Sequence, residues 1–130
     1  MVDSKSYLDW FKAAQKDLRS ADILFEHDAD NEIVCFHCQQ AIEKYLKGYL
    51  IYKTGYINEG HSLIRLCKRA MEYEINFNKY LKNLAFVNNF YIETRYPAED
   101  PLHVSNEDVA DCINYANEII SYIKEITKID

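Results

Sequence analysis

Apolar residues recur every three or four positions along most of this chain, and this period limits the possible folds more than any other feature. From Lys5 to His27 they form one stripe, and a second, more regular stripe follows Ser105. A period of 3.6 residues places such side chains on one face of an α-helix. No segment shows the alternation of a β-strand. The second stripe consists of Val109, Cys112, Ile113, Ala116, Ile119, Ile120, Ile123 and Ile126.

Turn and capping residues divide this pattern into helices, expected over about 5–27, 31–54, 62–73, 78–93 and from 105 onward. Gly55 is placed to end the second helix as a C-cap. Pro97 and Pro101 rule out a continuous helix between the last two. Ser105 and Asp108 have the spacing of a capping box. Long helices joined by short loops predict an all-α, antiparallel up-down four-helix bundle with an additional short helix.

Length and composition agree with one domain over residues 1–130. The chain is 48% hydrophobic and contains only 3 Gly and 2 Pro, which argues against disorder and against a turn-rich β architecture. No run reaches the roughly 20 apolar residues of a membrane span, and the N-terminus lacks the apolar region of a signal peptide. We therefore expect no membrane association and a cytoplasmic location. The cysteines are expected to be reduced thiols.

The segment 31–54 is apolar around most of its circumference, which predicts a central helix. Its narrow polar strip is expected to remain hydrated. Within the strip, Glu43 precedes Lys47 by four residues, the favourable orientation for a helical ion pair. The strip consists of Gln39, Gln40, Glu43, Lys44 and Lys47.

Charge is unevenly distributed along the chain. The net charge is −6, which disfavours broad, nonspecific binding to nucleic acid. The stretch 44–69 nevertheless carries +5, so the remainder carries −11. Two interpretations stay open: one basic surface, or cations scattered around two hydrated helices.

Cys35, His37 and Cys38 have a spacing that invites a zinc interpretation. No second Cys or His pair at ligand spacing follows, and a lone CxxC within an apolar helix is interpreted as core packing. Nothing in the chain matches a phosphate-binding loop or a dinucleotide fingerprint. No metal and no cofactor are predicted.

Several motifs together resemble the HEPN family, and the resemblance covers nearly the whole chain. The segment QQAIEKYLK is its most specific part, because its spacing to the later motifs is hard to meet by chance. The matching positions are Asp17-Leu18 and Ala21, the run from Gln39 to Lys47, His61-Ser62-Leu63 with Leu66, and Arg95-Tyr96-Pro97.

The resemblance implies a helical bundle that is frequently dimeric and often paired with a minimal nucleotidyltransferase, as in toxin–antitoxin systems. Other HEPN proteins are metal-independent ribonucleases, with an Arg and a His separated by four to six residues. Here seven residues separate Arg95 from His103, and six carboxylates lie between Glu93 and Asp111. Both features weigh against RNA cleavage.

The leading hypothesis is an accessory HEPN protein that forms a homodimer and binds a nucleotidyltransferase partner, a nucleotide or RNA. The alternative is a metal-independent endoribonuclease in which His103 is the general acid or base and Arg95 stabilises charge on the phosphate. The ring of Tyr96 could stack on a base or on a partner side chain. His61 could bind a phosphate or simply cap the third helix. The predicted binding residues are Gln40, Lys44, Lys47, His61, Arg95 and Tyr96.

Overall fold

Helices account for the regular structure of the computed structural model, which describes residues 6–91 and 103–130. The elements are α1 (Tyr7–Glu26), α2 (Asn31–Thr54), α3 (Leu63–Met71), the 3₁₀-helix η1 (Ile75–Tyr80), α4 (Leu81–Asn88) and α5 (Asn106–Thr127). No strand occurs in the two described ranges. The predicted all-α class is confirmed.

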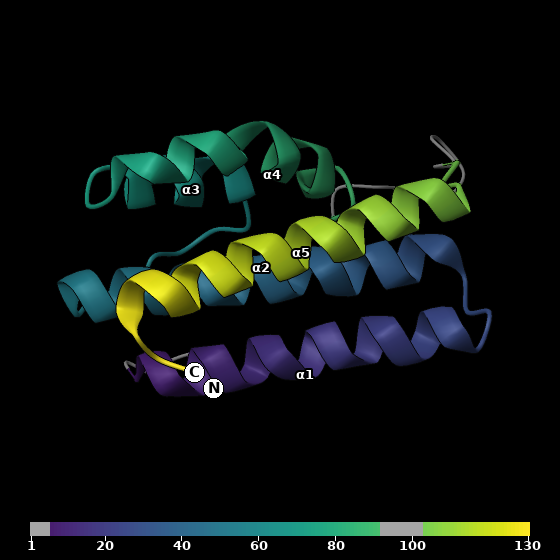
Figure 1. The fold of residues 1–130 in the computed structure, drawn as a ribbon, viewed down its shortest axis with the longest axis horizontal. Coiled ribbons are helices and arrows are strands. Elements are labelled where there is room, and N and C mark those ends of the chain that lie inside the picture. The colour runs from purple at the N-terminus through teal and green to yellow at the C-terminus, as the bar shows by residue number, and fades with distance from the viewer. Residues whose placement is uncertain (1–5, 92–102) are drawn as a thin grey trace.

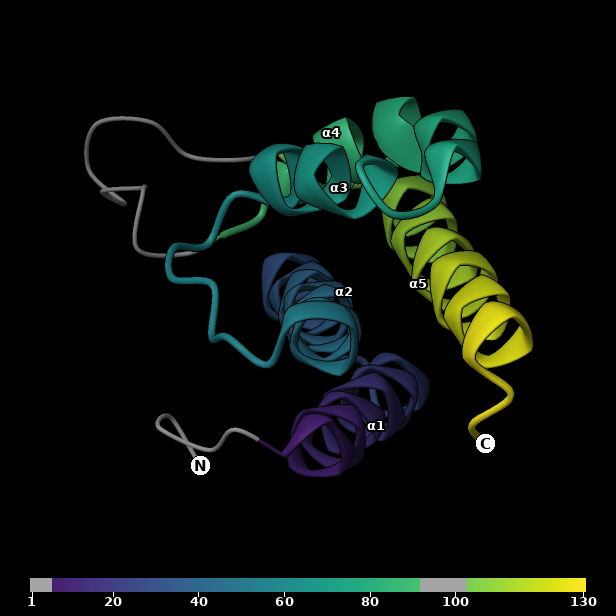
Figure 2. The same ribbon diagram turned by 90° about the vertical axis from the view of Figure 1, so that its left-hand side faces the viewer.

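The helix α2 lies at the centre of the bundle. It has α1 on one side, α5 on another and the layer of α3 and α4 on a third (Figures 1 and 2). The helix α1 runs antiparallel to both α2 and α5, as the colour gradient shows. The central position explains why the sequence of α2 is apolar on almost every side: most residues from Val34 to Ile51 are buried.

The residues predicted to end α2 and to cap the start of α5 do so in the structure. Gly55 ends α2 in the left-handed region with φ of 78°, a conformation that costs glycine no steric strain. The capping box at α5 is complete, because the Ser105 hydroxyl accepts from the Asp108 amide and the Asp108 carboxylate accepts from the Ser105 amide. These contacts satisfy amide groups that the first turn of a helix leaves unpaired.

The predicted helix 78–93 is wrong in its bounds. The chain first forms η1, and α-helical structure covers only Leu81–Asn88. The Glu74 side chain accepts from the Asn76 amide and starts the 3₁₀ turn. That turn inserts Phe77 into the core, with its ring centre 5.0 Å from that of Tyr49 and 5.1 Å from that of Tyr122.

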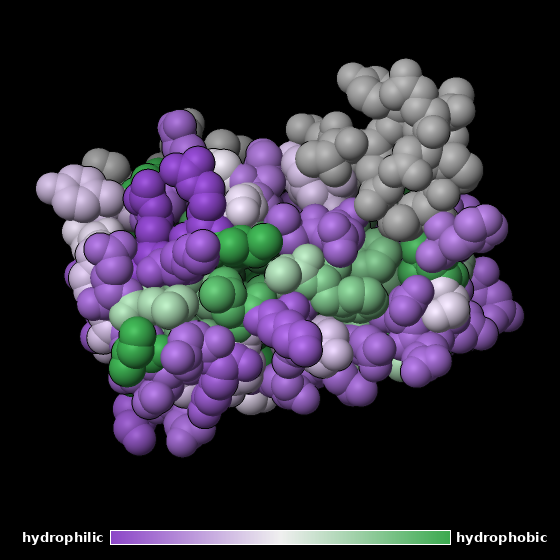
Figure 3. All heavy atoms as spheres, turned by 90° about the horizontal axis from the view of Figure 1, so that it is seen from above, coloured by the Kyte–Doolittle hydropathy of each residue, from purple (hydrophilic) through white to green (hydrophobic). Residues whose placement is uncertain are grey.

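The surface on the side of α3 and α4 is partly hydrophobic and partly hydrophilic. Figure 3 shows a hydrophobic band that crosses a largely hydrophilic surface. Apolar side chains that are only partly buried on these elements include Met71, Leu81 and Phe86. A membrane-crossing helix, which needs length and an unbroken apolar stretch, is not found in either described range.

Candidate functional site

Three polar side chains lie one helical turn apart on α2 and are buried. Gln39 is 0% exposed, Glu43 4% and Lys47 6%. The expectation that this part of the strip stays hydrated is therefore wrong. The reason is tertiary: the segment that carries His61 packs over this side of α2, and Trp10 of α1 lies near Lys47, whose Nζ is 5.8 Å from the ring centre.

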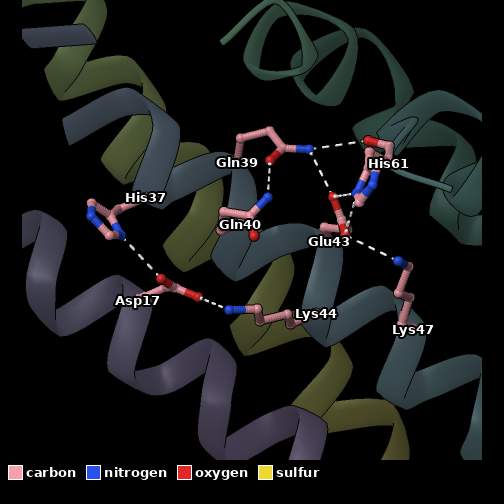
Figure 4. Close-up of polar contacts among 8 residues, drawn as sticks. All are labelled: Asp17, His37, Gln39, Gln40, Glu43, Lys44, Lys47 and His61. Carbon is pink, nitrogen blue, oxygen red and sulfur yellow. Dashed lines mark hydrogen bonds and ion pairs between the residues drawn. The ribbon is translucent and has the colours of Figure 1, made fainter. Parts of the chain in front are cut away.

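The Glu43 carboxylate is the centre of this buried group (Figure 4). It accepts from Lys47 Nζ at 3.0 Å and from Gln39 Nε2 at 3.2 Å. The His61 Nδ1 lies 3.0 Å from Oε2 and 3.2 Å from Oε1. The predicted ion pair between Glu43 and Lys47 is confirmed. A buried charge is tolerated when it is paired and hydrogen-bonded in this way.

His61 connects the buried group to the surface. Its backbone carbonyl accepts from Gln39 Nε2 at 3.1 Å, and its side chain is 50% exposed. Its ring stacks on Tyr91 with ring centres 4.4 Å apart and planes at 17°. A carboxylate only accepts hydrogen bonds, so Nδ1–H faces Glu43 and Nε2 is the ring nitrogen left for a ligand. The capping role belongs to Ser62, whose hydroxyl accepts from the Arg65 amide at 3.2 Å.

A second polar group joins α1 to α2. Asp17 of α1 lies between His37 and Lys44 of α2, with Oδ1 3.0 Å from His37 Nδ1 and Oδ2 2.6 Å from Lys44 Nζ. These side chains are part-exposed, at 14% for Asp17, 28% for His37 and 26% for Lys44. Gln40 lies between the two groups and donates to Gln39 Oε1 at 2.8 Å (Figure 4).

Sequence reasoning did not assign a site role to Asp17 or His37. The spacing of His37, Gln40 and Lys44 places them on one face of α2. This spacing could have indicated that His37 lies beside the predicted binding residues Gln40 and Lys44. Asp17 belongs to another helix. Its pairing depends on how α1 packs against α2, which periodicity does not show.

The structure brings together four of the predicted binding residues: Gln40, Lys44, Lys47 and His61. Of these, Lys47 is 8% exposed at its side chain and is held by Glu43, so it supports the site from within. Arg95 and Tyr96 lie outside the described residues.

His103 is exposed and precedes the N-cap of α5. The adjoining backbone is attached to the start of α2, because Asn31 Nδ2 donates to the Val104 carbonyl at 3.0 Å and to Asn106 Oδ1 at 3.0 Å. His103 therefore lies near the N-terminal end of α2. Its predicted convergence with Arg95 stays a prediction.

The cations of the stretch 44–69 are divided between different surroundings. Lys44 and Lys47 are in ion pairs with carboxylates. Lys53 Nζ lies 5.7 Å from the Tyr52 ring centre. On α3, Arg65, Lys68 and Arg69 are exposed. Among the described residues, the exposed cations of this stretch without a carboxylate partner are therefore Lys53 and the three on α3.

The CxxC motif is part of the core, as interpreted from the sequence. Cys35 and Cys38 are 0% exposed. Burial, with a smaller contribution from Cys35, raises the pKa of the Cys38 thiol far above its ordinary value. Cys67 and Cys112 are also buried free thiols. No group of three or more His, Cys, Asp or Glu side chains in the described ranges is placed to hold a metal ion.

Fold and site together define a class: an all-α bundle whose long central helix carries a buried Gln-Glu-Lys series, joined to a half-exposed histidine. The family model of the HEPN domain matches residues 7–126. The chain therefore belongs to the HEPN family.

Two solved structures resemble the chain over nearly its full length. TT1696 from Thermus thermophilus is 25% identical with a TM-score of 0.78, covering 92% of this chain and 96% of that one. ST0689, described as an archaeal HEPN homologue, is 26% identical with a TM-score of 0.71, covering 98% of this chain and 100% of that one. No curated protein shows significant similarity to the sequence.

Proposed function

We propose that this HEPN protein is an accessory partner of a minimal nucleotidyltransferase, in a pair of the toxin–antitoxin type, and that it binds a nucleotide at the α2 face. The observation that carries the proposal is His61, which is half-exposed, held by Glu43 and stacked on Tyr91. A held imidazole beside an aromatic ring suits a ligand that has both an anionic and a planar part.

Each side chain has a distinct part in this proposal. As an imidazolium whose Nδ1–H faces Glu43, His61 presents Nε2–H as a donor, and the part-exposed Lys44 ammonium provides a positive charge for phosphate. Asp17 restrains Lys44 through the contact at 2.6 Å. Lys47 acts indirectly: it pairs with Glu43, which orients His61.

Calorimetric titration with ATP, GTP, CTP and UTP tests the binding step. We expect His61→Ala and Lys44→Ala each to weaken binding about tenfold, the effect of one charge-assisted contact. The matched controls are His27→Ala and Lys12→Ala, which remove exposed side chains elsewhere on the molecule and should leave affinity unchanged. Equal losses in controls and site variants would contradict a site at this face.

The partner is tested separately by identifying any nucleotidyltransferase encoded beside this chain and co-purifying the two proteins. The proposal fails if neither nucleotides nor such a transferase bind to the purified protein. The absence of a transferase gene in the neighbourhood would equally remove the partner assignment.

We also propose a homodimer. The hydrophobic band on the α3 and α4 side (Figure 3) supports it, since contiguous exposed apolar surface commonly marks a contact surface. Light scattering coupled to size-exclusion chromatography should give twice the chain mass of 15.4 kDa. A monomer throughout the accessible concentration range would contradict this part of the proposal.

The second candidate is a metal-independent endoribonuclease. It is supported by the exposure of His103 beside the start of α5, where its ring is accessible to a substrate. Cleavage of an RNA panel in the presence of EDTA, abolished by His103→Ala and by Arg95→Ala, would establish it. An intact RNA panel would exclude it and leave the accessory role.

A further inference from the structure

A second feature lies away from the α2 face, where η1 and α5 form an open groove of about 690 Å³. In Figure 2, α5 lies on the opposite side of α2 from the loop that carries His61. The groove is lined by the carboxylates of Glu74, Glu118 and Glu125 and by the ammonium of Lys79. It thus combines three negative charges with one positive charge.

Two tyrosine rings provide a platform for a cation in this groove. The ring centres of Tyr80 and Tyr122 are 5.0 Å apart. Lys79 Nζ lies 5.4 Å from the first centre and 5.1 Å from the second. The chain's own lysine therefore marks a position at which the π-faces and the surrounding carboxylates attract a positive charge.

Tyr122 also contributes a buried polar atom without a partner. Tyr122 is 8% exposed, and within the described part of the chain its hydroxyl has no hydrogen-bond partner. Burial, followed by the charges of Glu74, Tyr80 and Glu125, raises its pKa to about 12. These neighbours line the same groove as the Tyr122 ring, while the hydroxyl itself is enclosed by the protein. The hydroxyl therefore remains protonated and uncharged at neutral pH.

We propose that this groove docks an extended basic segment of a partner protein. A Lys or Arg of that segment takes the position of Lys79 over Tyr80 and Tyr122, and the carboxylates of Glu118 and Glu125 balance its charge. The proposal is independent of the nucleotide site on α2.

The shape and the remaining lining groups favour a peptide over a small cation. Small-molecule sites usually enclose most of their ligand, whereas this groove is open along one side. Asn117 Nδ2 donates to the Ile113 carbonyl at 2.9 Å, which leaves its carbonyl oxygen to accept from a peptide N–H. The hydroxyl of Ser121 lies in the same groove and can pair with a peptide carbonyl.

Fluorescence anisotropy with labelled, end-capped hexaarginine tests this docking. We expect Glu118→Gln/Glu125→Gln to weaken binding about tenfold through the loss of two charges. Lys79→Ala should strengthen binding several-fold because it removes the competing internal cation. Tyr122→Phe should leave binding nearly unchanged, because it keeps the aromatic ring and removes only the enclosed hydroxyl.

The matched control is Asp22→Asn/Glu26→Gln, which removes two exposed carboxylates from α1 and should leave affinity unchanged. Circular dichroism melting checks that each variant folds. No binding to the wild type, or equal losses in both double variants, would overturn the groove as a docking site. Displacement of hexaarginine by an equal concentration of spermine would overturn the choice of a peptide over a small cation.

Discussion

Glu43 shows how strongly one side chain depends on its neighbours. Its side chain is 5% exposed and is paired with Lys47, whose side chain is itself buried. We expect Glu43→Ala to lower the free energy of unfolding by about 3–5 kcal/mol, because it leaves the Lys47 charge buried without its partner. Urea unfolding followed by circular dichroism measures this loss.

The control for this prediction is the double variant Glu43→Leu/Lys47→Met. Removing both charges and keeping similar volumes should restore much of the lost stability, since buried ion pairs are often replaceable by apolar side chains. His61→Ala should lower the free energy of unfolding much less than Glu43→Ala, because the His61 side chain is half-exposed. If the double variant were as unstable as Glu43→Ala, an uncompensated Lys47 charge would not be the cause.

At the scale of elements, α1 and α2 approach each other closely at Gly48. A Cβ at this position would lie 2.6 Å from Phe11 Cε1 and 3.2 Å from Trp10 Cβ. The Phe11 ring cannot shift easily, since it stacks on Tyr45 with ring centres 4.4 Å apart. Overpacking costs about 1–3 kcal/mol and the helix propensity of alanine returns about 1. We therefore expect Gly48→Ala to destabilise the protein.

Thermal melting of Gly48→Ala against wild type measures this effect. Asn114→Ala is a suitable control, because Asn114 is an exposed position on α5 and alanine should be tolerated there. A melting temperature for Gly48→Ala at or above that of wild type would show that the two helices can separate at no cost.

The cap of α5 gives a second prediction for an element. Ser105→Ala removes the hydroxyl that accepts from the Asp108 amide at 3.0 Å, and we expect a loss of about 1 kcal/mol. The control is Ser121→Ala, which removes an exposed hydroxyl within the same helix and no cap. Chemical unfolding of both variants should show the larger loss at Ser105. Equal losses would contradict a stabilising capping box.

For the whole molecule, buried phenols and thiols make stability depend on alkaline pH. Burial raises the pKa of Cys67 from 9.0 to about 11. Burial, with Glu74 next, raises the pKa of Tyr49 from 10.0 to about 12. Above about pH 9 the unfolded chain releases protons that the folded chain retains. The stabilising contribution of these groups should therefore be constant below that pH and fall between about pH 9 and 12.

Urea unfolding at a series of alkaline pH values measures this dependence. Tyr49→Phe should reduce the slope, because it removes one of the titrating groups. The substitution should lower the free energy of unfolding only slightly at neutral pH, since the Tyr49 hydroxyl has no hydrogen-bond partner among the described residues. A slope unchanged by Tyr49→Phe would mean that Tyr49 does not contribute.

Much of the fold could be predicted because its signals are local. The stripes of α1 and α5, the end of α2 at Gly55 and the capping box at Ser105 depend on residues within one or two turns. The start of α4 after η1 could not be predicted from the sequence, because η1 forms where the Phe77 ring enters the core between Tyr49 and Tyr122. That packing involves segments distant in the sequence.

For the site, the sequence by itself determined that Gln39, Glu43 and Lys47 share one face of a helix, because a 3.6-residue period requires it. Only the tertiary structure decided that this face is buried, that His61 meets Glu43 and that Asp17 pairs with Lys44. The physical reason is that burial and pairing depend on which other helix or loop covers a face. Helix periodicity indicates which residues share a face, but it does not indicate which helix or loop packs against that face.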